Sequence, residues 1–291
     1  MLQCGPALPM SNQIPSPLAE LPSFIYGTAW KEDRTRELVS SALEAGFRAV
    51  DTANQRKHYF EVAVGEAVQA FVESGKITRS QLFLQSKFTY LDSQDHRLPY
   101  HPAAAPAQQV QQSLASSLDH LRTTYLDSYL LHGPSKRHGL TARDWEVWRA
   151  MEAQHGEAKV ARLGISNVTS DQLKMLVRDC RTQPAFVQNR CYARLGWDAE
   201  VRAVCRDRGI VYQGFSLLTA NQSELAHPHV TRIARDKQCA AEQVIFRFAM
   251  QVGMIPLTGT SSRVHMKADL DSASFELSDS ELTAIERVSF A

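Results

Sequence analysis

The sequence predicts an α/β protein, a (β/α)8 TIM barrel with an extra helix near the C-terminus. Strand-like and helix-like segments alternate eight times along the chain, and strict alternation requires parallel strands joined by right-handed crossovers. Eight such units close naturally into a barrel. The chain has 291 residues, enough for a fold that typically needs ~250. A doubly wound open sheet is the alternative.

The expected strands are short runs of apolar, strand-compatible residues. The second one, for example, begins after Gly46 and runs from Phe47 through Asp51 to Ala53. In chain order, the expected strands cover residues 24–29, 47–53, 82–87, 127–132, 163–167, 185–188, 210–216 and 253–257.

The expected helices carry apolar side chains three and four positions apart, which places them on one face. Val110, Leu114, Leu118 and Leu121 show this spacing. The segment Ser170-Asp171 is expected to supply the N-cap of its own helix. The helices are expected near 33–45, 60–75, 107–122, 142–155, from 170 onward, 198–208, 228–251 and 261–270, with a final one near 279–288 outside the eightfold pattern.

We expect a single domain across residues 1–291, in which residues 1–22, rich in Pro, Ser and Gly, form an irregular arm. The formal charge of +1 favours neither nucleic acid nor an anionic membrane. No apolar stretch approaches the ~20 residues of a membrane span. We therefore expect neither partner, and a monomer, because no long exposed apolar helix stands out.

The five cysteines are scattered and contain no CxxC pair, which favours free thiols in a reducing compartment. The N-terminus lacks the basic region and apolar run of a secretory signal, so the expected location is cytoplasmic. No metal site is expected, because there is no HExxH motif and His96, His101 and His132 lie on different segments.

Polar side chains stand at the ends of successive expected strands. Asp51, Lys87 and His132 close the second, third and fourth, and Ser166 with Asn167 closes the fifth. In α/β barrels, the carboxyl ends of the strands carry the chemistry. The sequence therefore predicts one site assembled from several strand–helix loops.

In these landmarks the chain resembles the aldo-keto reductases along nearly its whole length. The landmarks are Gly27-Thr28-Ala29-Trp30, the segment 47–53, Lys87, His132 within Leu-Leu-His-Gly-Pro, Gly164-Ile165-Ser166-Asn167, Gln188 and Phe215-Ser216. The resemblance implies a (β/α)8 barrel that reduces a small carbonyl compound with NADPH and without a metal.

The resemblance also implies a catalytic tetrad in which a tyrosine donates the proton, assisted by Asp51, Lys87 and His132. Tyr59 is the only tyrosine in the corresponding loop, although it lies one residue closer to Glu61 than the family pattern has it. His58 is the fallback. A lysine cation beside the phenol would lower the pKa of the tyrosine, and a carboxylate would offset the desolvation of that lysine.

For the cofactor, the resemblance assigns Ser166, Asn167 and Gln188 to the nicotinamide carboxamide and Phe215 to the face of its ring. Arg263 corresponds to the arginine that grips the adenosine 2′-phosphate, whereas Leu257 replaces a usual basic residue. No GxGxxG motif is present, and NADPH is expected in preference to NADH. The remaining expected cofactor contacts are Thr28, Ser216, Leu218, Thr258, Gly259 and Thr260.

The long loop 89–106 leaves the third strand at the active-site face, and such loops are frequently functional. We expect an aromatic-walled substrate pocket that includes Trp30, Tyr90 and Tyr192, with Arg97 available to an anionic or polar group.

Two other functions fit the same residues. One is a redox-silent barrel that binds NADP(H), which the unusual spacing before Tyr59 favours. The other is a cofactor-independent lyase or isomerase that uses Asp51 and His132 as base and acid and turns over without nicotinamide.

Overall fold

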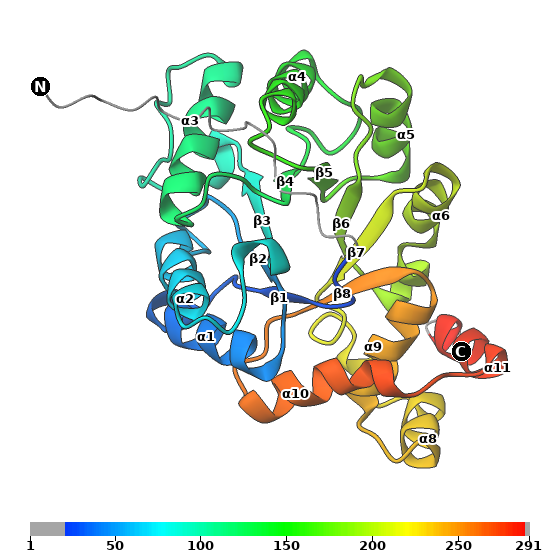
Figure 1. The fold of residues 1–291 in the computed structure, drawn as a ribbon. Coiled ribbons are helices and arrows are strands. Elements are labelled where there is room, and N and C mark those ends of the chain that lie inside the picture. The colour runs from blue at the N-terminus through cyan, green and yellow to red at the C-terminus, as the bar shows by residue number, and fades with distance from the viewer. Residues whose placement is uncertain (1–20, 289–291) are drawn as a thin grey trace, which may run out of the picture.

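The computed structural model describes residues 21–288, in which eight parallel strands close into a barrel in chain order (Figure 1). β8 pairs with β1, with Ile25 opposite Leu257. This closure confirms the predicted (β/α)8 fold and excludes the open sheet. The strands are β1 (Ile25–Gly27), β2 (Ala49–Asp51), β3 (Phe83–Phe88), β4 (Ser128–Leu131), β5 (Leu163–Ser166), β6 (Phe186–Arg190), β7 (Val211–Phe215) and β8 (Met254–Thr258).

Helices surround the barrel on its outside (Figure 1). They are α1 (Thr35–Ala45), α2 (Glu61–Glu73), α3 (Pro106–His120), α4 (Ala142–Gly156), α5 (Ser170–Asp179), α6 (Ala199–Arg208), α7 (Gln222–Leu225), α8 (Pro228–Asp236), α9 (Ala241–Gln251), α10 (Arg263–Asp271) and α11 (Asp279–Glu286). Short 3₁₀ turns are η1 (Glu32–Arg34), η2 (Arg79–Gln81), η3 (Leu91–Ser93), η4 (Ala193–Asp198) and η5 (Ser272–Ser274). The expected C-terminal helix is α11.

One strand and one helix cap differ from the sequence-based expectation. The strand expected at 47–53 is hydrogen-bonded as a strand only over Ala49–Asp51. The helical segments expected near 228–251 are present as α8 and α9, and Gln238 between them has a φ of 56°. The N-cap of α5 is Thr169, whose hydroxyl accepts from the backbone of Gln172, and not Ser170. The expected arm, 1–22, lies outside the described residues except for 21 and 22.

The side chains that point into the barrel are apolar in one half of the interior and polar in the other. On β3, Phe83, Gln85 and Lys87 are two residues apart and therefore share one face. Apolar side chains fill the lower interior: Ile25, Ala49, Phe83, Leu130, Phe186, Ile255 and Leu257. One step further along the strands the interior becomes polar. The carboxyl ends of the strands therefore hold a buried polar layer above an apolar plug.

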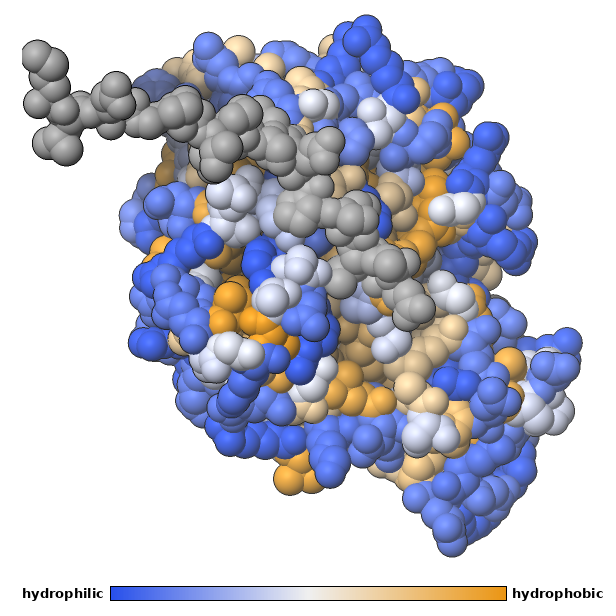
Figure 2. Space-filling model, in the orientation of Figure 1, coloured by the Kyte–Doolittle hydropathy of each residue, from blue (hydrophilic) through white to orange (hydrophobic). Residues whose placement is uncertain are grey.

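A separate and larger apolar core lies between the strands and the surrounding helices, and includes Trp148 and Phe246. Figure 2 shows mostly hydrophilic residues around the rim, whereas apolar residues gather towards the middle of that face. Among the described residues, no helix is long and apolar enough to cross a membrane.

Candidate active site

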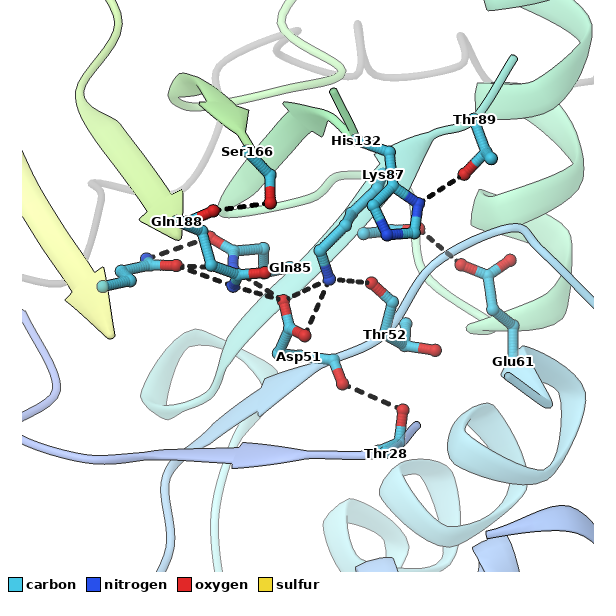
Figure 3. A network of polar contacts seen from close by, with 12 residues as sticks. Thr28, Asp51, Thr52, Glu61, Gln85, Lys87, Thr89, His132, Ser166 and Gln188 are labelled. Atoms are coloured by element: carbon cyan, nitrogen blue, oxygen red, sulfur yellow. Dashed lines mark hydrogen bonds and ion pairs between the residues drawn. The ribbon is translucent and has the colours of Figure 1, made fainter. Parts of the chain in front are cut away.

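Asp51 and Lys87 form a buried ion pair at the carboxyl ends of β2 and β3 (Figure 3). The Lys87 Nζ lies 2.7 Å from each Asp51 carboxylate oxygen and 2.8 Å from the backbone oxygen of Thr52. All three donor positions of the ammonium are thus used. Burial lowers the pKa of Lys87, and the charge and hydrogen bonds of Asp51 oppose that shift.

Two glutamines donate to the same carboxylate, and a third glutamine links these two. The Nε2 atoms of Gln85 and Gln188 donate to Asp51 Oδ1 at 2.7 and 3.0 Å. Both also donate to Gln213 Oε1, and Gln213 Nε2 returns a bond to Gln85. Every contact to Asp51 Oδ1 comes from a donor: Lys87, Gln85 and Gln188. Sequence reasoning missed Gln85 and Gln213, although their spacing from other inward-facing residues could have revealed them.

Tyr59 reaches the same end of the barrel from the loop after β2. The Lys87 Nζ lies 5.3 Å from the centroid of its ring, and the His132 ring lies 6.0 Å away, edge to face. Among the described residues, the Tyr59 hydroxyl has no hydrogen-bond partner. The four residues predicted as a tetrad are therefore neighbours in space.

The expected direction of the Tyr59 pKa is wrong in this structure. Burial raises that pKa, and the negative charge of Asp51 raises it further. The physical reason is that Asp51 matches the charge of Lys87 at 2.7 Å, so little net positive field remains for the phenol. Tyr59 is consequently protonated at neutral pH.

His132 follows β4, and its imidazole is fixed by Thr89. The Thr89 hydroxyl lies 2.6 Å from Nδ1. Burial lowers the pKa of His132 to about 3, with a smaller contribution from the Lys87 charge. The imidazole is therefore neutral at physiological pH and keeps one N–H.

His58, the fallback proton donor, has a different environment. Its ring stacks on Trp30 with a centroid distance of 4.0 Å. Its Nδ1 lies 2.9 Å from Gln55 Oε1. Burial and the charge of Lys57 lower the pKa of His58. His58 therefore holds a donatable proton less readily at neutral pH than Tyr59 does.

A cavity of about 770 Å³ runs from the tetrad across the barrel mouth to the beginning of α10. It begins beside Asp51, Tyr59 and His132. The predicted residues that line it further along are Trp30, Ser166, Asn167, Gln188, Phe215, Ser216, Leu218, Thr258, Gly259 and Thr260. The cavity thus has residues of the predicted tetrad at one end and residues near the start of α10 at the other.

Left-handed backbone conformations recur where strands meet this cavity. Trp30, Asn167 and Ser216 have φ values of 61°, 51° and 57°. Such conformations are uncommon for residues other than glycine and concentrate at functional sites. The Asn167 Nδ2 donates to the backbone oxygen of His132 at 2.8 Å, which leaves its Oδ1 free to accept a bond from a ligand.

Several lining residues were not among the predicted site residues, although the sequence already places His265, a basic residue, in this region. Lys31 and His265 contribute positive or titratable groups near Gly259, and the Lys31 Nζ donates to the Gly259 oxygen. Glu242 and Asp269 contribute carboxyl groups at the same end. Lys31 could have been found, because it directly follows Trp30 at the end of the first strand–loop unit.

Besides Lys87, five predicted site residues do not line this cavity, and each of them is engaged in other contacts. The Thr28 hydroxyl donates to the backbone oxygen of Asp51 at 2.9 Å and supports β2. Arg263, expected at the cofactor phosphate, bonds Ser41 Oγ at 3.1 Å and pairs with Glu44 on α1. These two contacts turn the guanidinium away from the cavity.

Tyr90, Arg97 and Tyr192 do not line the main cavity, and the loop 89–106, which carries the first two, contacts α3 and α4. Tyr90 is buried, and its hydroxyl donates to Asp144 at 2.8 Å. Arg97 pairs with Asp95 and lines a separate cavity of about 280 Å³ that borders Tyr59. Tyr192 packs against Arg194, with the guanidinium 4.8 Å from its ring.

A His-x-His pair, His227 and His229, begins α8, with ring centroids 5.1 Å apart. Within residues 21–288, no group of three or more His, Cys, Asp or Glu side chains is arranged to hold a metal ion.

A model of the aldo/keto reductase family matches residues 24–289, and the chain belongs to this family. It is similar to the glyoxal reductase of Bacillus subtilis (strain 168), at 29% identity over 269 residues, 92% of this chain and 88% of the relative. An aldo-keto reductase of Mycobacterium avium (strain 104) is 32% identical over 270 residues, 92% and 86% of the two chains. These relatives support carbonyl reduction as the activity and identify an oxidoreductase.

Solved structures agree with the barrel. The aldose reductase from Schistosoma japonicum has a TM-score of 0.78 at 23% identity, covering 91% of this chain and 88% of that one. An aldo/keto reductase from Brucella melitensis has a TM-score of 0.77 at 25% identity, covering 92% and 95%. The first of these likenesses concerns the fold alone.

Proposed function

We propose that this chain reduces an aldehyde or ketone to an alcohol with NADPH, with Tyr59 as the proton donor. The carrying observation is that Asp51, Lys87, Tyr59 and His132 meet at one end of a cavity that continues to the N-terminus of α10. Reduction of a carbonyl builds negative charge on its oxygen, so a proton donor and a hydrogen-bond donor are needed beside that oxygen.

The protonation states of the side chains suit these roles. Tyr59 has a raised pKa and carries its proton at neutral pH. His132 is neutral, so its cavity-facing nitrogen can orient the carbonyl oxygen without introducing a second cation. The Lys87 ammonium lies 5.3 Å from the centroid of the Tyr59 ring, and because Asp51 balances its charge, the phenol keeps its proton until the carbonyl oxygen takes it.

The lining residues fit a nicotinamide dinucleotide. Ser166, Asn167 and Gln188 would hold the carboxamide, with Phe215 against the ring and Thr258, Gly259 and Thr260 near the phosphates. When bound, the cofactor would supply the hydride that the carbonyl carbon receives. Lys31 and His265 would face the adenosine end, joined by Arg263 if it leaves Glu44. The preference for NADPH over NADH rests on these three basic side chains, and Glu242 and Asp269 line the same end of the cavity.

The substrate remains a small carbonyl compound of unspecified class, with Trp30 at the cavity mouth. The cytoplasmic location and the monomeric state remain predictions. Four cysteines within the described residues are free, which suits a reducing compartment.

The test is loss of NADPH absorbance with a panel of aromatic and aliphatic aldehydes, with NADH as the cofactor control. Turnover that falls by several orders of magnitude in Tyr59→Phe and survives in His58→Gln would support the proposal. Loss of turnover in His58→Gln but not in Tyr59→Phe would identify His58, and not Tyr59, as the proton donor. NADPH binding without turnover would favour the redox-silent barrel, and turnover without nicotinamide would favour a lyase or isomerase.

A further inference from the structure

Thr89 directly follows β3, and its side chain contacts the imidazole of His132. It is not one of the residues to which a role was assigned above. It is 2% exposed. Its hydroxyl lies 2.6 Å from His132 Nδ1, and Figure 3 shows the two side chains facing each other above Lys87. In the described part of the chain, this is the only partner of the Thr89 hydroxyl.

Both sides of this contact are held firmly in place. The backbone oxygen of Thr89 accepts from the Tyr100 hydroxyl at 2.7 Å and from Gln94 Nε2 at 3.4 Å. The backbone nitrogen of His132 donates to the oxygen of Phe88 at 2.9 Å. The long loop 89–106 thus holds the residue that contacts the imidazole, even though its own Tyr90 and Arg97 do not line the main cavity.

A neutral imidazole has one N–H and one acceptor nitrogen, so the contact allows two arrangements. In the first, the Thr89 hydroxyl donates to Nδ1 and the ring proton is on Nε2. In the second, Nδ1–H donates to the hydroxyl, and the hydroxyl proton needs another acceptor. Because Thr89 is buried and has no other partner, the second arrangement leaves a buried donor unpaired.

We propose that Thr89 is a positioning residue that fixes His132 as the Nε2–H tautomer and presents that N–H to the carbonyl oxygen of the substrate. An unpaired buried donor corresponds to a bias of about tenfold or more between the two arrangements. The tautomer assignment stands on the geometry of the free protein, whereas its catalytic consequence rests on the proposed reductase function.

The first test reads the tautomer directly. In ¹⁵N-histidine-labelled protein at neutral pH, long-range proton–nitrogen correlation spectra distinguish a protonated from an unprotonated ring nitrogen, and the His132 signals are identified by their loss in His132→Gln. We expect Nε2 protonated and Nδ1 unprotonated. A protonated Nδ1 in the parent would overturn the proposal, and this reading does not depend on any substrate.

Two variants then separate the hydroxyl from the side-chain volume. Thr89→Val keeps the shape and removes the hydroxyl, and we expect it to weaken the bias by about tenfold, so that mixed or averaged nitrogen signals appear. Thr89→Ser keeps the hydroxyl and should retain the parent spectrum. An unchanged spectrum in Thr89→Val would refute the role of Thr89.

The kinetic arm uses NADPH and an aldehyde that the parent reduces. We expect kcat to fall about tenfold in Thr89→Val with little change in KM, because the N–H contact strengthens as charge develops on the oxygen. Thr89→Ser should restore the rate. If the parent spectrum is as expected but the parent reduces no carbonyl, the proposed function fails and the tautomer assignment stands. An equal kcat in Thr89→Val and the parent would remove the positioning role.

Discussion

Replacing Asp51 with Asn should expose how strongly the barrel interior depends on its ion pair. Asp51 is the partner of a lysine that is 0% exposed. The amide of Asn keeps an oxygen that can still accept from Gln85 and Gln188, so the glutamine network has a partner. What disappears is the negative charge 2.7 Å from the Lys87 ammonium.

The size of the effect follows from the burial of that ammonium. Removing one partner of a buried ion pair typically costs about 3–5 kcal/mol, because the remaining charge is left uncompensated. Lys87 can limit this loss by giving up its proton. Burial already lowers its pKa, and the opposing influence comes first from Asp51, so the Asn variant should lower that pKa further.

The pH dependence gives the sharper signature. A lysine with a lowered pKa in the folded state binds fewer protons there than in the unfolded chain, so stability rises with pH between the two pKa values. The slope is about 1.4 kcal/mol per pH unit, up to the unfolded value near 10.4. In the parent, Asp51 holds Lys87 protonated to higher pH, so the same rise begins later.

Urea unfolding of Asp51→Asn and the parent at several values between neutral pH and pH ~10 measures this difference. We expect a gap of about 3–5 kcal/mol near neutral pH that narrows as the pH rises. The double variant Asp51→Asn/Lys87→Met is the control, because it has no buried charge and should lose the pH dependence. Parallel curves for single variant and parent would refute the reasoning.

Two further substitutions test packing and a second buried acid. Gly65→Ala should destabilise the protein by about 1–3 kcal/mol, because a Cβ on α2 would lie 2.0 Å from the backbone oxygen of His120; Gly156→Ala, with open space around it, is the matched control, and equal Tm values would contradict the clash. Burial raises the pKa of Asp269 to about 6, so the folded state binds more protons than the unfolded chain and stability falls as pH rises from about 4 to 6. Asp269→Asn keeps an acceptor for Thr258 and should gain up to about 3 kcal/mol on the parent between about pH 4 and pH 7 in urea unfolding; a constant difference would exclude a raised pKa.

The polar residues at strand ends were predictable, because a parallel strand has a direction and a fixed alternation of faces. Asp51, Lys87 and His132 each close an apolar run, and the carboxyl ends of parallel strands meet at one face of a barrel. The order of the strands along the chain therefore predicts that these three side chains lie close together in space. The ion pair between Asp51 and Lys87 confirms this for two of them.

The loop residues were not predictable in the same way, because no periodicity tells where a loop side chain points. Tyr90 looked available for substrate, yet its hydroxyl bonds Asp144 on α4, 54 residues later. Arg97 looked free, yet Asp95 pairs with it two residues away. No sequence pattern indicated a role for Thr89, because its contact with His132 joins residues that are 43 positions apart.

The amino-acid sequence by itself determined the alternating elements, the closed barrel they form and the polar groups at its carboxyl end, since these follow from local patterns of apolar and polar residues. Only the tertiary structure decided the charge states and partners. Burial keeps Tyr59 protonated and His132 neutral. Gln85 and Gln188, from separate strands, donate to Asp51, and Gln213 links the two glutamines. Desolvation and hydrogen-bond partners depend on distances across the fold, which no local pattern encodes.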